Sequence, residues 1–311
     1  MRLTTVTRTQ GNSRALTSGQ VRPEGVSLEF EDVPVLVHGF RRMVRELAYD
    51  VCEMAITTYL CAREHGVRFT ALPIFLVRGF HHAAILHNTE QGITDPRDLE
   101  GGRVAVNRGY TVTTGVWARG ILAEQYGVDL DRVTWVLSGD EHVERYRPPR
   151  NVVPAPEGAD VTAMLESGEL AAGIGIRSDA PHVAPLIPDP EQAAFDALVE
   201  RGLYPINHLV VVRDELLDEH PDLGPRLFDA FAESKRRYLE QLRDGKLDEP
   251  TATDETNRRL LDLIGDPYPY GIEANRDVIE RLIGHARAQR ILQQAVSVEE
   301  MFDPATIRLN A

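Results

Sequence analysis

Cysteine is almost absent from this 311-residue chain, in which only Cys52 and Cys61 occur. Both cysteines lie in an apolar stretch, and their spacing matches neither a CxxC metal motif nor a framework of paired cysteines. A disulfide-stapled fold is therefore excluded. We expect two buried free thiols.

Basic residues are fewer than acidic residues, 34 against 48, which gives a formal net charge of −14. This imbalance argues against nucleic acid as a partner. The chain also lacks an apolar run long enough to cross a bilayer, which excludes an integral membrane protein. Its first residues alternate as in a strand and lack the apolar segment of an export signal, so we expect a cytoplasmic protein.

The length and the hydrophobic content of 42% are sufficient for two globular lobes. Strands are predicted at 3–7, 26–30, 49–54, 69–77, 103–106, 133–137, 172–176 and 209–212, and helices at 40–47, 57–65, 113–126, 161–167 and after Pro221. Two successive β-α-β series indicate the α/β class with a largely parallel sheet. The proline-rich residues 147–156 lack periodicity and are expected to form a surface loop.

One crowded segment, Tyr268 to Arg276, combines a rigid turn with polar side chains. Pro269 and Gly271 specify the turn, and Glu273 follows at once. Such a segment forms either the wall of a binding site or the capped start of a helix, and composition alone leaves both readings open.

Several motifs occur in order along the chain: Asp50 to Met54, Tyr59 with Leu60, Arg78 to His82, Tyr110 through Thr113 to Gly120, Tyr204 to His208, and Tyr268 to Arg276. Together they resemble the 4,5-dihydroxyphthalate decarboxylase family. The resemblance implies the type 2 periplasmic-binding-protein fold, in which two α/β lobes are joined by two crossovers and enclose a ligand cleft. Crossovers near 87–89 and 205–207 would make residues 1–89 and 207–311 one lobe and residues 90–206 the other.

Loss of carbon dioxide from a hydroxylated aromatic acid needs a proton donor at the ring carbon and a base or acceptor at a ring hydroxyl. His82 and His208 are the candidates given the resemblance, because imidazole titrates near neutral pH; which is acid and which is base stays open. Glu53 ends a buried apolar run, so it is expected to be a catalytic carboxylate or the partner of a cation. Each histidine has the alternative role of a core residue bonded to a backbone carbonyl.

A second carboxylate on the substrate needs a cation, and the planar guanidinium groups of Arg14 and Arg78 suit it. Surface ion pairs are the alternative for both. Thr113 and Thr114 begin a helix whose first N–H groups can hold an anion, and plain capping is the alternative. The remaining candidates for substrate contact are Tyr59, Tyr110, Trp117, Arg177, Asn207 and Glu273.

No cofactor is expected, although a divalent metal held by Glu53, His82 and His208 is an alternative. The first loop, with Gln10 to Ser13, and Ala83 depart from the family pattern, so a related aromatic or heteroaromatic acid is an alternative substrate. We expect a carboxy-lyase acting on 4,5-dihydroxyphthalate or a similar acid. The alternative is a solute-binding protein for a small aromatic or organic acid. Assembly into a homo-oligomer stays open.

Overall fold

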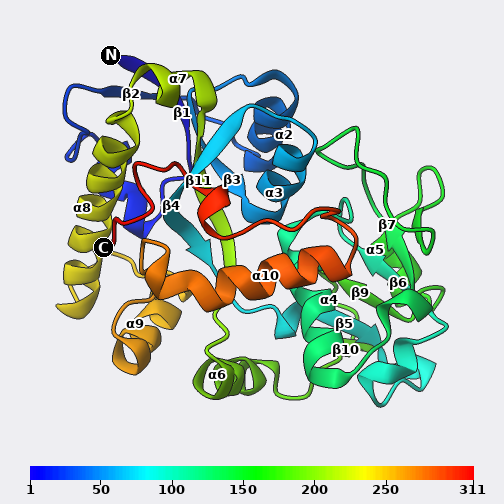
Figure 1. Cartoon of the computed structure of the whole chain (residues 1–311). Coiled ribbons are helices and arrows are strands. Elements are labelled where there is room, and N and C mark those ends of the chain that lie inside the picture. The colour runs from blue at the N-terminus through cyan, green and yellow to red at the C-terminus, as the bar shows by residue number, and fades with distance from the viewer.

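The computed structural model describes residues 1–311 and contains two β-sheets, one in each of two lobes (Figure 1). The order across the first sheet is β2 (Ser27–Phe30), β1 (Arg2–Val6), β3 (Val51–Ala55), β11 (Ile206–Arg213) and β4 (Phe69–Arg78). β1 pairs in parallel with β2 and β3, whereas β11 is antiparallel to both of its neighbours. This sheet therefore combines segments from the two ends of the chain.

The second sheet has the order β10 (Val183–Pro185), β5 (Ile85–Asn88), β9 (Ala172–Ile174), β6 (Arg103–Val106), β7 (Thr134–Leu137) and β8 (Val152–Pro154). Its last four strands are parallel, and β5 is antiparallel to β9 and β10. The outgoing crossover thus covers residues 79–84, ahead of residues 87–89 where it was expected. The chain returns to the first sheet at β11.

The helices of more than three residues are α1 (Arg14–Thr17), α2 (Leu36–Glu46), α3 (Ile56–Glu64), α4 (Thr113–Tyr126), α5 (Val161–Glu166), α6 (Pro190–Arg201), α7 (Asp214–Glu219), α8 (Leu223–Arg243), α9 (Ala252–Ile264), α10 (Arg276–Ala288) and a 3-10 helix at Pro96–Leu99. Helix α4 has the predicted bounds. The predictions missed α6, although Pro190 at its first position and Gly202 after its end mark its limits. They also missed the short strands β5, β8 and β10; β8 lies inside the predicted loop 147–156.

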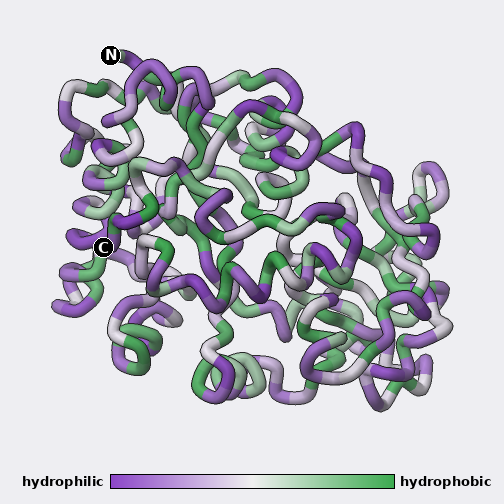
Figure 2. Tube along the Cα trace, in the orientation of Figure 1, coloured by the Kyte–Doolittle hydropathy of each residue, from purple (hydrophilic) through white to green (hydrophobic).

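All five residues of β3 are buried, and a continuous hydrophobic core extends from the first sheet to α4, where Trp117 is buried. Figure 2 shows hydrophobic residues along the inner strands and hydrophilic residues along the outer loops. Cys52 and Cys61 are buried and free, which confirms that prediction. None of the helices is both long and apolar enough to cross a membrane.

Helix α10 connects the two lobes, running from the side of the first lobe to α4 (Figure 1). At its end, the buried amide of Gln289 donates to the carbonyl of Val116, 2.9 Å away, and accepts from Nε of Arg119 at 2.8 Å. The last helices of the chain therefore hold the second lobe as well as the first.

Candidate functional site

A pocket of about 250 Å³ lies between the lobes, at the ends of strands from both sheets. This is where open α/β sheets bind ligands. Its lining residues are Arg8, Pro34, Val35, Leu36, Val37, Phe40, Ala55, Thr58, Arg108, Val112, Thr113, Thr114, His142, Asn207 and His208. We refer to it as the cleft pocket.

Three helices begin at the cleft pocket, namely α2, α3 and α4. Their N-cap residues are Val35, Ala55 and Val112, all on the pocket wall, and none of them caps its helix with a side chain. The first N–H groups of a helix have no partner within the helix, and its dipole makes that end positive. Three such ends around one pocket favour an anionic ligand.

An arginine from each lobe adds positive charge. Arg8 follows β1, and its guanidinium lies 3.7 Å from Glu53 with half of the side chain exposed. Arg108 follows β6 in the other lobe and adopts a left-handed backbone, with φ of 70°. Its guanidinium has no ion pair within the protein; only its backbone N–H is engaged, donating to Oγ of Ser138 at 2.7 Å. Arg108 is therefore available to a carboxylate.

His208 and Glu53 form a pair on neighbouring strands β11 and β3. Nδ1 of His208 lies 2.6 Å from Oε1 of the fully buried Glu53. The other carboxylate oxygen accepts from the hydroxyl of Thr7 and the N–H of Arg8, both at 2.9 Å. Burial acts to raise the pKa of Glu53, but its interactions with His208 and Arg8 outweigh burial and lower it. Glu53 is thus an ionised carboxylate that orients the imidazole of His208 toward the pocket.

A buried threonine cluster joins the lobes beside the pocket. The hydroxyl of Thr57, in α3, donates to the carbonyl of Thr111 and lies 2.7 Å from the hydroxyl of Thr113, in α4. Thr113 and Thr114 are the first two residues of α4 and line the cleft pocket, where they were expected.

Asn207 also lines the pocket, and a buried histidine holds its side chain. Its side-chain oxygen lies 3.0 Å from Nε2 of the buried His81. Burial lowers the pKa of His81 to about 4, so this imidazole is neutral near pH 7 and donates to Asn207.

The structure places His82 outside the cleft pocket. Its Nε2 lies 3.0 Å from the side-chain oxygen of Gln125, in α4, and burial lowers its pKa. The geometry therefore does not support the prediction that His82 and His208 act as acid and base at one site. The alternative metal set would need His82 beside Glu53 and His208, which the structure does not show. The described side chains include no cluster of three or more His, Cys, Asp or Glu arranged to hold a metal.

Arg78 is buried in the first lobe rather than exposed to the pocket. It donates to the side chain of Asn275 at 2.8 Å and to the carbonyl of Tyr204, and it lies over the Tyr204 ring. Burial lowers its pKa to about 10. Residues 268–275 lead into α10, which begins at Arg276, and Tyr268 and Tyr270 lie in the core. The segment thus precedes a helix, as in the second reading, but Asn275 at the N-cap position makes no capping side-chain bond.

Several other predicted site residues lie outside the cleft pocket. Tyr110 and Trp117 are core residues, with Tyr110 stacked under Arg119 at 3.8 Å and the indole N–H of Trp117 donating to Ile206. Arg14 lines a separate pocket beside Tyr238, and Arg177 and Glu273 are exposed residues away from the cleft pocket.

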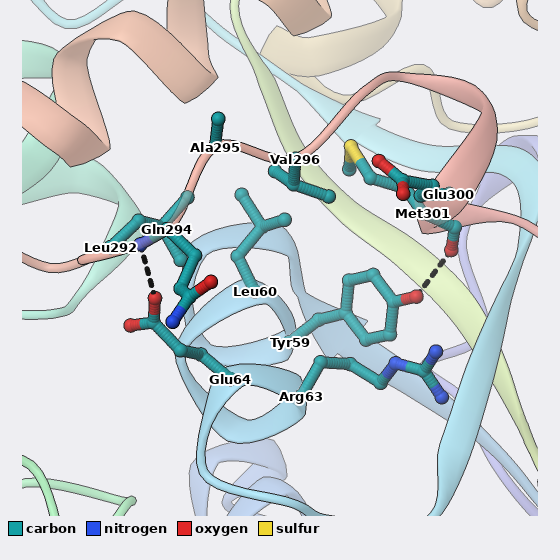
Figure 3. Close-up of a pocket in the computed structure, with 10 residues that line it drawn as sticks. All are labelled: Tyr59, Leu60, Arg63, Glu64, Leu292, Gln294, Ala295, Val296, Glu300 and Met301. Atoms are coloured by element: carbon teal, nitrogen blue, oxygen red, sulfur yellow. Dashed lines mark hydrogen bonds between the residues drawn. The ribbon is translucent and has the colours of Figure 1, made fainter.

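Tyr59 lines a larger cavity of about 350 Å³ between α3 and residues 292–301 (Figure 3). Its hydroxyl donates to the carbonyl of Met301, and Oε1 of Glu64 accepts the N–H of Gln294 at 2.8 Å. These contacts attach the C-terminal segment to α3. We therefore place the candidate site in the smaller cleft pocket, which has the unpaired guanidinium of Arg108 and three helix starts.

Sequence reasoning missed Arg8, Arg108, Thr58, Phe40 and His142, all on the cleft pocket. The sequence did contain a signal for the two arginines. Each lies two residues after the end of a short strand, and residues that follow parallel strands commonly line the ligand cleft of an α/β sheet. His142 lies in an irregular loop, where no periodicity marks it.

Comparison with known proteins agrees with this architecture. No protein-family model matches the chain. A 4,5-dihydroxyphthalate decarboxylase from Comamonas testosteroni is 32% identical over 313 residues, covering 94% of each chain. Another from Pseudomonas putida is 35% identical over 199 residues, covering 59% of this chain and 76% of that one.

Solved structures at low identity share the fold. A Candida albicans protein described as having the generic periplasmic binding protein fold matches with a TM-score of 0.58 at 12% identity, covering 100% of this chain and 99% of that one. The periplasmic aliphatic sulphonate binding protein of Escherichia coli matches with 0.54 at 11%, covering 99% and 98%. The chain therefore has the periplasmic-binding-protein fold and belongs to the 4,5-dihydroxyphthalate decarboxylase family.

Proposed function

We propose that this protein is a carboxy-lyase that decarboxylates a hydroxylated aromatic dicarboxylic acid, such as 4,5-dihydroxyphthalate, in the cleft pocket. The observation that carries the proposal is the His208–Glu53 pair beside two arginines and three helix starts. The family membership supplies the reaction class, and the pocket supplies groups suited to it.

The substrate carries two carboxylates, and the positive groups of the pocket suit both. Arg8 from one lobe and Arg108 from the other bind carboxylate oxygens, and the N–H groups at the start of α4 complete the binding. Holding the substrate from both lobes couples binding to closure of the cleft.

The proton donor is His208, whose Nδ1 lies 2.6 Å from the carboxylate of Glu53 and is oriented by it. It transfers its proton to the ring carbon that carries the departing carboxylate. The carbon–carbon bond then breaks, carbon dioxide leaves, and the bonding electrons restore the aromatic ring. One proton is consumed for each carbon dioxide released, and solvent reprotonates His208.

The test is incubation of the purified protein with 4,5-dihydroxyphthalate and related aromatic acids in D₂O, with and without added divalent metal. We expect carbon dioxide and 3,4-dihydroxybenzoate with one deuterium at the carbon that lost its carboxylate. Saturable binding without release, seen as a rise in melting temperature, would instead identify a solute-binding protein and refute the proposal.

A further inference from the structure

The cleft pocket contains a second histidine, His142, in the loop between β7 and β8 of the second lobe. This side chain is only 4% exposed, yet it lines the pocket. Its Nδ1 is buried without a hydrogen-bond partner, and Nε2 has no partner in the protein either; only the backbone carbonyl is engaged, accepting from Arg45 at 3.2 Å. A buried imidazole nitrogen without a partner is uncommon, because buried polar groups are normally paired, and on a pocket wall it suggests a role toward a ligand.

The surroundings of His142 keep it neutral. Burial lowers its pKa to about 4, the positive charges of Arg41, Arg108 and Arg45 act in the same direction, and Asp140 opposes them. Its lone pair is therefore available as an acceptor near pH 7.

The two pocket histidines thus have opposite environments. His208 faces the carboxylate of Glu53, whereas His142 faces arginines. Both stand edge-on to Phe40, whose ring centroid is 5.1 Å from that of His208 and 6.5 Å from that of His142. One imidazole paired with a carboxylate and one imidazole without a hydrogen-bond partner, both on one pocket, suit the roles of proton donor and proton acceptor.

We propose that His142 is the base that takes the proton of the substrate hydroxyl para to the departing carboxylate. This inference rests on the proposed function. A weak base suffices, since the hydroxyl becomes strongly acidic only when His208 protonates the ring carbon.

The hydroxyl proton moves to His142 while the ring carbon gains the proton of His208, which leaves a dienone that still carries both carboxylates. The carbon–carbon bond breaks, carbon dioxide departs, and the electron pair restores the ring and a phenolate oxygen. That oxygen recovers its proton from His142.

The first test uses the wild-type protein and 4-hydroxyphthalate, in which only one carboxylate has a para hydroxyl. Loss of that carboxylate gives 3-hydroxybenzoate, and loss of the other gives 4-hydroxybenzoate. We expect 3-hydroxybenzoate as the main product. Comparable amounts of both products would overturn the proposal.

The second test compares His142→Ala and His142→Gln with His220→Ala, which removes a histidine at the end of α7, away from the pocket. With 4,5-dihydroxyphthalate, we expect both His142 variants to lose ~10²–10⁴-fold in kcat with KM changed only a few-fold, as for loss of a general base. Added imidazole should restore part of the rate to His142→Ala but leave His220→Ala unaffected.

The outcomes separate the two claims. Wild-type activity with an unchanged kcat in the His142 variants, or a loss that imidazole does not relieve, would overturn the role of His142 and leave the proposed function intact. A wild-type protein that releases no carbon dioxide would overturn both.

Discussion

Glu53 is a residue whose contribution to stability depends on pH. Its folded pKa lies below the ordinary value of 4.5, because His208 and Arg8 outweigh burial. A carboxyl group with a lowered folded pKa stabilises the protein above its unfolded pKa, and that stabilisation is lost as pH falls through the folded pKa.

Glu53→Gln should therefore destabilise the protein by ~1–3 kcal/mol near neutral pH, since buried donors lose a charged acceptor. The difference from wild type should shrink once pH falls below 4.5. Denaturant unfolding of both proteins across this range measures it. A difference that stays constant with pH would show that the ionised carboxylate is not what stabilises this site.

Arg108 combines a strained backbone with a place on the wall of the cleft pocket. A left-handed backbone costs a non-glycine residue roughly 1–2 kcal/mol, and strained residues that persist are often located at binding sites. Arg108→Gly should raise the free energy of unfolding by about 1 kcal/mol while raising KM ~10-fold or more, because a charged hydrogen bond to the substrate is lost.

The matched control is Arg290→Gly. Arg290 is also an arginine with positive φ, of 60°, but it lies after α10 and outside the cleft pocket. The substitution Arg290→Gly should relieve backbone strain without changing KM. Equal effects of the two substitutions on KM would remove Arg108 from the binding site.

At the scale of elements, helix α2 of the first lobe holds the loop between β7 and β8. Arg41 lies 2.6 Å from Asp140, and Arg45 pairs with Asp140 at 3.3 Å and Glu144 at 3.0 Å. Arg45 also donates to the carbonyls of Glu141 and His142. These contacts cross between the lobes and position the loop that carries His142.

Arg45→Ala should therefore weaken substrate binding and lower the melting temperature by a few degrees, about 1 kcal/mol, since part of the contact is an exposed ion pair. Arg236→Ala is the control, because Arg236 pairs only with Glu233 and Glu240 within α8. Calorimetric titration and melting curves measure both effects. If Arg236→Ala weakened substrate binding and Arg45→Ala did not, Arg45 would not be the residue that positions the loop between β7 and β8.

The elements also show what sequence could predict. Helix α4 was predicted end to end, because Gly127 ends a long apolar pattern that starts at Thr113. Strand β8 was missed because it lies in a proline-rich stretch and itself ends at Pro154, which reads as a loop. The spatial neighbours of Glu53 were not accessible either, since its pairing with His208 depends on β3 and β11 being adjacent in the sheet although 155 residues apart. Arg78 has the right chemistry for a carboxylate, but the fold buries it against Asn275.

At the scale of the whole molecule, two lobes joined by crossovers at residues 79–84 and before Ile206 form a hinged cleft. The expected division was residues 1–89 with 207–311 against residues 90–206, but β5 belongs to the second sheet. We therefore propose that residues 85–205 move as one lobe against residues 1–78 with 206–311. Ligand contacts from Arg8 and Arg108, one on each lobe, would then stabilise a closed state.

Small-angle scattering should consequently show a smaller radius of gyration with saturating 4,5-dihydroxyphthalate than without it. Arg108→Gly at the same ligand concentration should show less compaction. An unchanged radius with a tightly bound ligand would refute closure of the lobes.

The periplasmic-binding-protein fold serves binding proteins as well as enzymes, so function must be tested at the site. The most direct measurement is carbon dioxide release from 4,5-dihydroxyphthalate by the wild-type protein and by His208→Ala. The account predicts release by the wild type and a kcat ~10²–10⁴-fold lower in the variant, with a similar KM. Equal rates in the two proteins, or ligand binding without any release, would contradict it.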